Sequence, residues 1–340
     1  MPCTLSERSK LPELPEIEHL KRTLEPVLVG SEITTVRILR RDILHRGSGY
    51  EKETARIKSE CLLARSRIIR LDRYGKQLAL SSESGKVLCI HLGMSGQLQY
   101  LPTKSRLENN RHVHCIWTIR GPKSSGRLIF RDPRRFGGIW VFATLDELHI
   151  SRWSRLGPDA LDIRSRSLFQ QLIRTRKSIK SALLDQSLIA GVGNIYADEC
   201  LFASGIHPSR PSNELSTVEV TKLAKHLRKI LQNAIRAGGS TIHSYIDGNG
   251  EVGTYVSKHQ VYGRAHMPCV KCCRPLCRTT IAQRTTVFCS TCQRAENESP
   301  RRNVKVFRTC PQITPRRSQC IIDLDLMLGH EVSRKGVIRE

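Results

Sequence analysis

The 340-residue sequence lacks any apolar run approaching the roughly 18 residues that a membrane-spanning helix needs. Its start, MPCTLSERSK, has no apolar core of the kind found in secretory signals, so we expect a cytoplasmic protein with no membrane-spanning segment. Aromatic residues make up only 5%, which gives no sign of a large apolar ligand site. Acidic residues are also few, 31 against 56 Lys and Arg. The net charge of +25 predicts a polyanionic partner, either nucleic acid or an anionic membrane surface.

The 13 cysteines are the most informative residue type present. Because no secretory signal is visible, metal binding is a better use for closely spaced cysteines than a disulfide framework. Two CxxC pairs separated by sixteen residues can place four thiolates tetrahedrally around one structural Zn²⁺. The predicted ligands are Cys269, Cys272, Cys289 and Cys292. Cys273 and Cys277 lie inside the loop as competing ligands, and incidental cysteines in a reduced protein are the alternative interpretation.

The first part of the chain predicts one helix followed by many strands. Apolar residues spaced by three or four predict a helix over Pro15–Leu28. Eight short β-type runs then follow, separated by turn residues, which favours an all-β sandwich or barrel. The runs are Ile33–Leu39, Ile68–Leu71, Gln77–Leu80, Val87–His91, Gln97–Leu101, His114–Ile119, Arg127–Phe130 and Gly138–Phe142.

After Pro158 the pattern becomes helical. Short helices are expected within 167–175, 178–187 and Asn194–Ala203, and the clearest helix is Glu214–Ala237. Ser216 and Glu219 have the spacing of a capping box near its start. From Tyr255 the sequence is again β-like, and its Arg-, Pro- and Ser-rich end is expected to be disordered.

Three further motifs each allow two interpretations. LPELPEIE, residues 11–18, reads locally as an acidic helix N-terminus. GVGNIYADE, residues 191–199, is either a phosphate-binding helix start or an ordinary tight turn. DPRRFG, residues 132–137, is either a loop whose Arg and Phe enter a DNA groove, or a hairpin loop with Phe packed underneath.

These motifs, with RYGKQLAL, HLGMSGQL, LGP, ASGIHP, QVYGR and IAQRTTVFC, occur in the order and spacing of one family. From about Leu11 to Gln293 the sequence resembles the bacterial formamidopyrimidine-DNA glycosylases. The resemblance implies an α+β multidomain fold. Its parts would be a catalytic β-sandwich flanked by helices (12–145), a linker (146–160), a helix-two-turn-helix domain (161–254) and a zinc-finger β-ribbon (255–294). Residues 1–11 would be an extension and 295–340 a disordered basic tail.

The resemblance also implies an activity: base-excision repair of damaged double-stranded DNA by a monomeric enzyme. The family removes 8-oxoguanine and formamidopyrimidines, then cuts the strand by β,δ-elimination. Pro12 matches the nucleophile that forms a Schiff base, and Glu13 matches the residue that acts as acid and base. Lys76 matches a proton donor in β-elimination. Arg284 matches the zinc-finger arginine that holds a phosphate and assists δ-elimination.

DNA-contacting positions are implied in the same way. Met94, Arg134 and Phe136 match residues that fill the space left by an extruded base, with Arg134 facing the orphaned cytosine. Further matches to DNA-contacting residues are His112, Arg135, Arg176, Lys180 and Asn194. Residues 244–256 align with a loop that closes over 8-oxoguanine, without assigned base contacts.

The position of Pro12 raises a chemical requirement. Because Leu11 precedes it, the Pro12 nitrogen is an amide whose lone pair is delocalised, and it cannot attack a sugar carbon. We therefore expect translation to start at Leu11, read as Met and then removed. Two alternatives remain: an endonuclease VIII-like enzyme for oxidised pyrimidines, whose group typically begins PEGPE rather than PELPE, and a non-catalytic zinc DNA-binding protein.

Overall fold

The computed structural model describes residues 12–47, 57–105, 111–122, 124–240 and 253–295. Its first half is built from β1 (Glu32–Ile38), β2 (Leu44–Arg46), β3 (Ser66–Tyr74), β4 (Gln77–Ser82), β5 (Val87–His91), β6 (Gln97–Pro102), β7 (Val113–Arg120), β8 (Ser125–Arg131) and β9 (Gly138–Phe142). Within the described residues these strands form one sheet in the order β2-β9-β5-β4-β3-β1-β7-β8-β6. Each of the eight predicted strands is present, whereas β2 was not predicted because three residues are too few to show an alternating pattern.

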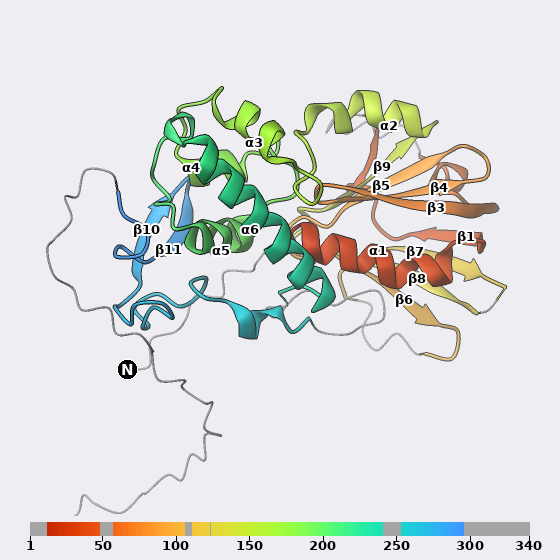
Figure 1. The fold of residues 1–340 in the computed structure, drawn as a ribbon. Helices are drawn as coiled ribbons and strands as arrows, with labels where there is room; N and C mark the ends of the chain where they lie inside the picture. The colour runs from red at the N-terminus through yellow and green to blue at the C-terminus, as the bar shows by residue number, and fades with distance from the viewer. Residues whose placement is uncertain (1–11, 48–56, 106–110, 123, 241–252, 296–340) are drawn as a thin grey trace, which may run out of the picture. The chain divides into compact units, whose positions relative to one another are not determined.

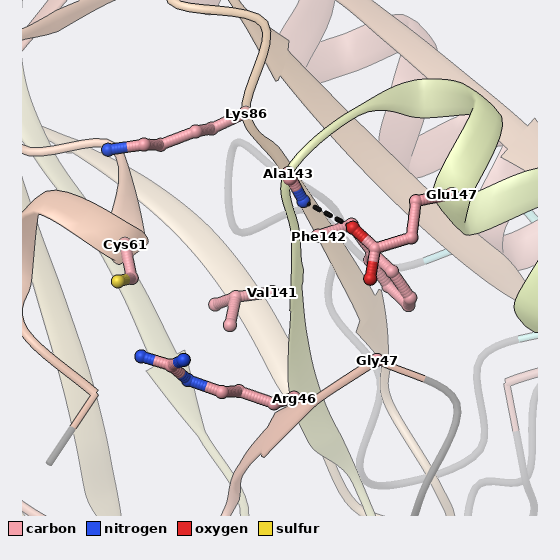
Figure 2. A pocket seen from close by; sticks show the side chains of 8 residues that line it. All are labelled: Arg46, Gly47, Cys61, Lys86, Val141, Phe142, Ala143 and Glu147. Carbon is pink, nitrogen blue, oxygen red and sulfur yellow. Dashed lines mark hydrogen bonds between the residues drawn. The ribbon is translucent and has the colours of Figure 1, made fainter. Parts of the chain in front are cut away.

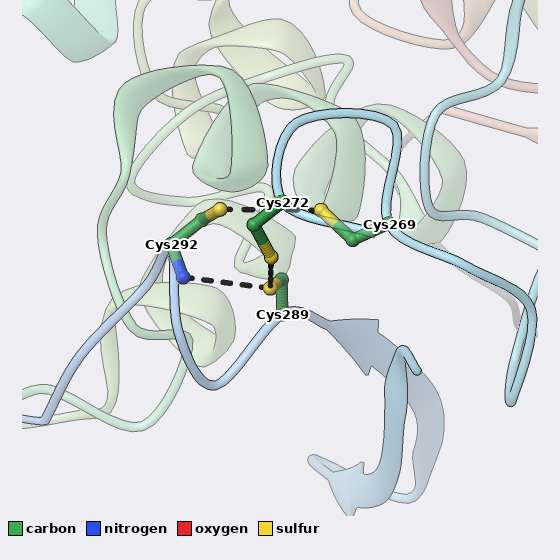
Figure 3. Close-up of side chains that lie close together, drawn as sticks. All are labelled: Cys269, Cys272, Cys289 and Cys292. Carbon is green, nitrogen blue, oxygen red and sulfur yellow. Dashed lines mark hydrogen bonds between the residues drawn. The ribbon is translucent and has the colours of Figure 1, made fainter. Parts of the chain in front are cut away.

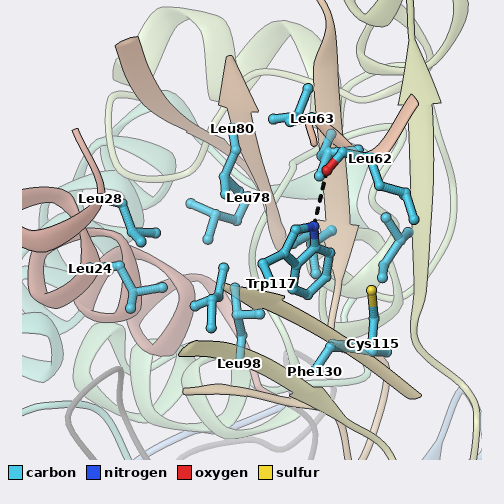
Figure 4. Close-up of a cluster of buried hydrophobic side chains, with 14 of the residues drawn as sticks. Leu24, Leu28, Leu62, Leu63, Leu78, Leu80, Leu98, Cys115, Trp117 and Phe130 are labelled. Atoms are coloured by element: carbon cyan, nitrogen blue, oxygen red, sulfur yellow. Dashed lines mark hydrogen bonds between the residues drawn. The ribbon is translucent and has the colours of Figure 1, made fainter. Parts of the chain in front are cut away.

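The sheet folds over at the junction of β1 and β3, which share only the pairs Glu32↔Arg67 and Ile33↔Ser66. The strands on the two sides of this junction form two facing layers (Figure 1). Leu78 and Leu80 from one layer and Trp117 from the other belong to the same buried cluster (Figure 4). The indole Nε1 of Trp117 donates to the carbonyl of Leu62 at 3.1 Å, so its polar atom is satisfied inside the core. The predicted β-sandwich is confirmed.

Helix α1 (Leu14–Leu28) connects two hydrophobic cores. Ile17, Leu20 and Leu24 recur at helical spacing and are buried in the sandwich core. Leu14, in the first turn, belongs instead to the core of the helical half. The first turn of α1 therefore lies where the two halves of the molecule meet.

The helical half contains α3 (Ser165–Leu172), α4 (Ile179–Leu184), α5 (Asn194–Ser204) and α6 (Thr217–Arg236). The predicted capping box at the start of α6 is present, with Glu219 N–H donating to Ser216 Oγ and Ser216 N–H donating to Glu219 Oε2. The helix begins at Thr217 rather than Glu214, because residues 212–214 form the short 3-10 helix η3 (Ser212–Glu214). The stretch expected as a linker contains helix α2 (Leu145–Ser151) and the 3-10 helix η2 (Trp153–Arg155).

The final described segment is less β-rich than expected. It contains the 3-10 helix η4 (Tyr255–Lys258) and a single two-stranded ribbon, β10 (Cys277–Ile281) and β11 (Arg284–Phe288), within the residues described. Closely spaced cysteines and prolines occupy 267–276, where turns replace the predicted strands. No helix in the described part of the chain is long and apolar enough to cross a membrane. The expectations for 1–11, most of the 244–256 loop and 296–340 fall outside the described residues.

Candidate active site

Glu13 lies immediately before α1 and is 2% exposed. Its carboxylate accepts backbone N–H groups of Ile195 at 2.9 Å and Tyr196 at 3.4 Å, in the first turn of α5. Position 193 must be glycine, since a Cβ there would lie 2.2 Å from Glu13 Cδ. Burial raises the pKa of Glu13 to about 7, although the charge of Lys76 and the two α5 amides act in the opposite direction. The carboxyl group can therefore hold or release a proton near neutral pH.

Glu16 extends this buried polar group. Its carboxylate accepts the Glu13 N–H at 2.9 Å, the Tyr196 hydroxyl at 2.6 Å and the Ser240 N–H at 2.7 Å. Burial raises its pKa as well. The Ser240 hydroxyl lies 2.8 Å from His259 Nε2. A continuous hydrogen-bonded chain thus runs from the start of α1 to the segment that follows residue 253.

Lys76 stands at the tip of the β3–β4 hairpin, whose two-residue turn is Gly75-Lys76. Gly75 has φ +56°, and a Cβ there would lie 3.2 Å from the Ala190 side chain, so the hairpin tip approaches the loop before α5 closely. Burial lowers the pKa of the Lys76 amine, while the charges of Glu13 and Glu16 raise it. The hairpin therefore brings an amine with a lowered proton affinity to the buried carboxyl groups.

A buried ion triad holds this hairpin. The Arg73 guanidinium, 5% exposed, donates to Glu18 at 2.8 Å and to both oxygens of Asp159, at 2.6 and 3.0 Å. The Gly75 N–H also donates to Asp159, at 2.8 Å. Since these residues come from α1, from the hairpin and from the segment that follows η2, the triad fixes Lys76 relative to both halves of the site.

The residues expected to fill the space of an extruded base come from two loops joined by Asp132, which is fully buried. Its carboxylate accepts the Ser95 hydroxyl at 2.5 Å, the Arg134 N–H at 3.2 Å and the Gly137 N–H at 2.7 Å. Because Met94 precedes Ser95, this carboxylate brings the Met94 loop beside the Arg134 loop. The aromatic ring of Phe136 is 55% exposed, with the Arg134 guanidinium 4.7 Å from its centroid. The interpretation with Phe packed underneath is wrong.

The other expected contacts around this loop are also at the surface. His112 is exposed, and its carbonyl accepts the Asp132 N–H at 3.0 Å. Arg135 is exposed and forms an ion pair with Asp42 at 3.0 Å. Burial lowers the pKa of His91 to about 4, and the charges of Arg152 and Lys76 lower it further while Asp132 raises it. His91 is therefore close enough to Lys76 of the hairpin and to Asp132 for their charges to act on it.

Asn194 and Lys180 hold the ribbon rather than facing solvent. Asn194 Nδ2 donates to the Thr285 carbonyl at 3.0 Å. The Lys180 ammonium donates to Asp198 at 2.6 Å, to the same Thr285 carbonyl at 3.1 Å and to Thr286 Oγ1 at 2.8 Å. These contacts dock β11 against α5 and place the exposed Arg284 next to the start of that helix.

This geometry corrects the prediction for Lys180. Its side chain is 0% exposed, and all three of its ammonium hydrogens have protein acceptors, so it is not placed for direct DNA contact. The physical reason is Asp198, a buried carboxylate that requires a cation. Arg176, in contrast, is exposed in the turn before α4.

Four cysteines converge where the ribbon joins the segment before it (Figure 3). The Sγ atoms of Cys269, Cys272, Cys289 and Cys292 all lie within 4.8 Å of one another. Cys269–Cys292 and Cys272–Cys289 approach to 3.9 and 3.4 Å. A tetrahedral ZnS₄ site with bonds of about 2.3 Å has S–S edges of about 3.8 Å, so this donor set fits zinc. The predicted choice of Cys272 over Cys273 is the one that the cluster shows.

Comparisons with known proteins agree with this geometry. The family model for the formamidopyrimidine-DNA glycosylase N-terminal domain matches residues 11–139, and that for the formamidopyrimidine-DNA glycosylase H2TH domain matches residues 156–245. The curated formamidopyrimidine-DNA glycosylase of Thermomicrobium roseum is 40% identical over 301 residues, covering 83% of this chain and 99% of that relative. The chain belongs to the formamidopyrimidine-DNA glycosylase family.

Solved structures of formamidopyrimidine-DNA glycosylases show the same architecture. The crystal structure of the MutM (Fpg) protein from Thermus thermophilus has a TM-score of 0.71 and 37% identity, covering 83% of this chain and 98% of that one. The wild-type Lactococcus lactis Fpg in complex with a DNA containing N7-benzyl-Fapy-dG has a TM-score of 0.72 and 30% identity, covering 84% and 100%. The predicted fold class and family, an α+β DNA glycosylase, are confirmed.

Sequence reasoning missed the residues that position this family's candidate site. Arg73 and Asp132 open the RYGKQLAL and DPRRFG motifs and Asp159 follows LGP, but the motifs did not show their roles because their partners are distant in sequence. Glu16 was visible only as one more acidic residue of a helix start. The available signal was the position of these residues in or directly beside the motifs.

A separate cavity of about 240 Å³ opens on the sandwich, near Arg46, Cys61, Lys86 and Glu147 (Figure 2). Glu147 accepts the Ala143 N–H at 2.7 Å, and the Lys86 amine donates to the Glu60 carbonyl at 3.3 Å. None of the predicted site residues lines this cavity. It is therefore not part of the candidate active site.

Proposed function

We propose that this member of the glycosylase family excises 8-oxoguanine and formamidopyrimidines from duplex DNA and then cuts the strand at the resulting site. The observation that carries the proposal is the buried Glu13 carboxyl group. It follows Pro12 directly, rests on the first amides of α5 and has a pKa raised to about 7. A proton donor and acceptor beside a proline nitrogen is the arrangement that amine-based covalent catalysis requires.

The chemistry starts from a neutral Pro12 secondary amine at a chain terminus. Its lone pair forms a bond to C1′ while the electrons of the glycosidic bond leave with the base, and the base takes up the proton that the Pro12 nitrogen loses. Opening of the sugar ring then gives an iminium, and protonated Glu13 supplies the proton that the ring oxygen needs. A terminal amine has a pKa of roughly 7.7–8.0, so a useful fraction is neutral at pH 7. This route requires Pro12 to be the first residue of the active chain.

Strand cleavage needs a base and a phosphate anchor near the iminium. In the proposal, Glu13 in its carboxylate form removes a sugar proton, and Lys76 at the hairpin tip acts on the departing phosphate. Burial lowers the pKa of Lys76, which eases proton donation. Arg284, exposed at the start of the docked strand β11, binds a backbone phosphate.

Base recognition is assigned to the two loops joined by Asp132. Extruding a base leaves a gap in the stack and an unpaired partner. The exposed Phe136 ring fills part of the gap, Met94 lies in the adjoining loop, and the Arg134 guanidinium faces the orphaned cytosine. Arg135, His112 and Arg176 are exposed cationic or titratable side chains that we assign to the DNA backbone.

A substrate panel tests this assignment. A chain beginning at Pro12 should cut duplexes with 8-oxoguanine opposite cytosine much faster than duplexes with thymine glycol opposite adenine. The reverse preference would assign the protein to the endonuclease VIII-like group instead. Cleavage of neither duplex, with intact DNA binding, would make the chain a non-catalytic DNA-binding protein.

We also propose that the four cysteines bind one structural Zn²⁺. When bound, the metal stabilises the ribbon and takes no part in the reaction. Purified protein should contain about one zinc per chain, as a single four-thiolate site requires. Cys289→Ser should lose the metal, whereas Cys273→Ser, outside the cluster, should retain it. Full zinc content in Cys289→Ser would contradict this ligand set.

A further inference from the structure

Helix α6 carries an unusual excess of positive charge. Beyond its first turn it has five cations, Lys222, Lys225, Arg228, Lys229 and Arg236, and no acidic residue. In the described part of the chain, none of these side chains forms an ion pair. Like charges three or four residues apart destabilise an isolated helix. The helix therefore tolerates a repulsion that a polyanionic partner would relieve.

The central part of this charged face borders a cavity of about 370 Å³. Its lining residues include His226 and Lys229 of α6, Lys258 of η4 and Lys271 of the segment before the ribbon. We call these four residues, with Lys222 and Lys225 on the adjoining turns of α6, the α6 basic cleft. Burial lowers the pKa of His226, and the charges of Lys222, Lys271, Lys229 and Lys225 lower it further. These four lysine charges are thus close enough to His226 to act on it.

Glu199, the acidic residue among those that line the cavity, does not pair with the lysines of the cleft. Glu199 is 4% exposed, and its carboxylate accepts the backbone N–H groups of Gln260, Val261 and Tyr262 at 2.8–3.1 Å. These three donors fix Glu199 within the protein, where it organises the segment after η4. Lys271 donates to the Phe202 carbonyl at 3.1 Å and its ammonium lies 4.3 Å from the Phe202 ring centroid. Lys229 and Lys258, both exposed, are the cavity lysines that remain for an external anion.

The α6 basic cleft is distinct from the candidate active site. Asn194 and the amides that hold Glu13 are at the first turn of α5, whereas Ala203, which lines the cavity, is nine residues further along that helix. At 1.5 Å per residue, these points are about 14 Å apart. Lys222 lies near Gly205, just beyond the opposite end of α5. α6 packs directly against α5 (Figure 1). The inner end of the cavity reaches Tyr255, whose ring lies 6.1 Å from that of Tyr196, so the distinction concerns the lysines of the cleft and not every residue of the cavity.

The geometry points to a second DNA-binding surface: we propose that the α6 basic cleft binds the phosphate backbone of a duplex segment outside the one held at the lesion. Lys222, Lys225 and Lys229 extend about 10 Å along α6, more than one isolated phosphate can contact. An extended polyanion fits this array. Protein interfaces are depleted of charge at their centre, whereas DNA interfaces are strongly positive, and this cleft is charged at its centre.

The test compares two triple variants of the whole chain with the same loss of charge. The first, Lys225→Gln/Lys229→Gln/Lys258→Gln, removes three cleft cations. The control, Lys104→Gln/Arg120→Gln/Arg155→Gln, removes three exposed cations elsewhere. For each protein, affinity for a long undamaged duplex is measured against salt concentration. The slope of log K against log salt is negative, and each lost phosphate contact should reduce its magnitude by about 0.9. The magnitude should therefore fall by about 2 to 3 for the cleft variant and hardly change for the control.

A short lesion-containing duplex, which reaches only the active site, provides the second readout. Its binding by the whole chain should be the same in the cleft variant as in the unsubstituted protein. Its cleavage, measured with the same two proteins made to begin at Pro12, should also be the same. Equal slopes for the two triple variants on the long duplex would overturn the proposal, as would an equal loss on the short duplex. Loss of binding to poly-glutamate with an unchanged DNA slope would assign the cleft to an acidic protein and also overturn it.

Discussion

The acidic run at the start of α1 contains carboxyl groups whose pKa values are shifted in opposite directions. Glu13 and Glu16 point towards α5, where their carboxylates accept hydrogen bonds from backbone amides and from Tyr196. Glu18, less than two turns along, accepts hydrogen bonds from the guanidinium groups of Arg73 and Arg22. Burial raises the pKa of the first two, whereas for Glu18 burial acts upward but the two arginines bring the pKa below its ordinary value.

This difference in pKa separates the carboxyl groups suited to proton transfer from the carboxylate that stabilises the fold. A buried carboxyl group held by neutral donors keeps a proton that it can exchange near pH 7. A carboxylate held by a buried guanidinium stays ionised and links chain segments, here α1, the Lys76 hairpin and the segment that carries Asp159. Substitution of Glu13 should therefore affect the rate of cleavage, whereas substitution of Arg73 should affect the free energy of unfolding.

The largest effect is expected for Glu13→Gln. The amide can still accept an α5 N–H, but it cannot donate or accept the catalytic proton, so cleavage should fall about 10²- to 10⁴-fold. Single-turnover cleavage of an 8-oxoguanine duplex by a chain beginning at Pro12 measures this. Glu25→Gln, at a half-exposed position on the same helix, is the control and should cleave normally. A normal rate for Glu13→Gln would remove Glu13 from the mechanism.

Arg73→Met should instead affect stability. It leaves Glu18 and Asp159 buried without their guanidinium, and breaking a buried ion pair in this way costs about 3–5 kcal/mol. The free energy of unfolding, measured with urea, should fall by that amount. A loss below about 1 kcal/mol, the value for a surface pair, would show that the triad is not structural.

The pH dependence of stability should have opposite signs for the two carboxyl groups. Glu13 binds its proton more tightly in the folded state, so its contribution is greatest at low pH and is lost as the pH rises from 4.5 to about 7. The difference in unfolding free energy between the unsubstituted protein and Glu13→Gln should change by about 3 kcal/mol over that interval. For Glu18→Gln the sign reverses, because the Glu18 contribution is lost as the pH falls. The same sign for both would contradict the comparison.

The smallest effect is expected for Arg22→Met. Its guanidinium is 55% exposed and pairs with Glu18 from the solvent side at 2.8 Å. Exposed pairs contribute about 0–1 kcal/mol, so thermal unfolding should hardly shift. A destabilisation as large as that of Arg73→Met would mean that exposure does not distinguish the two partners of Glu18.

Much of this molecule could be predicted from the sequence because the signals are local. The helix Pro15–Leu28, the eight strands and the capping box of α6 follow from periodicity and turn residues over short windows. The four-cysteine cluster follows from spacing alone. Glu13, Lys76 and Arg134 could be singled out because they lie inside motifs, such as RYGKQLAL and DPRRFG, that match those of a known family.

The rest depends on contacts between distant residues. Lys180 was assigned to DNA because it is a lysine at a matching position, yet Asp198 and the ribbon use its entire ammonium group. The contrast between Glu13 and Glu18 was equally invisible, since Arg73 is 55 residues away from Glu18 in sequence. Sequence patterns show which residues are charged, but only the fold shows which charges are already paired.

The central claim is that the Pro12 amine forms a covalent intermediate with damaged DNA, and borohydride trapping tests it most directly. Two proteins are mixed with an 8-oxoguanine duplex: the 340-residue chain and a chain beginning at Pro12. The account predicts a trapped protein–DNA adduct for the Pro12 chain and none for the longer one, whose Pro12 nitrogen is an amide. Equal trapping by the 340-residue chain, verified as intact by mass spectrometry, would contradict it.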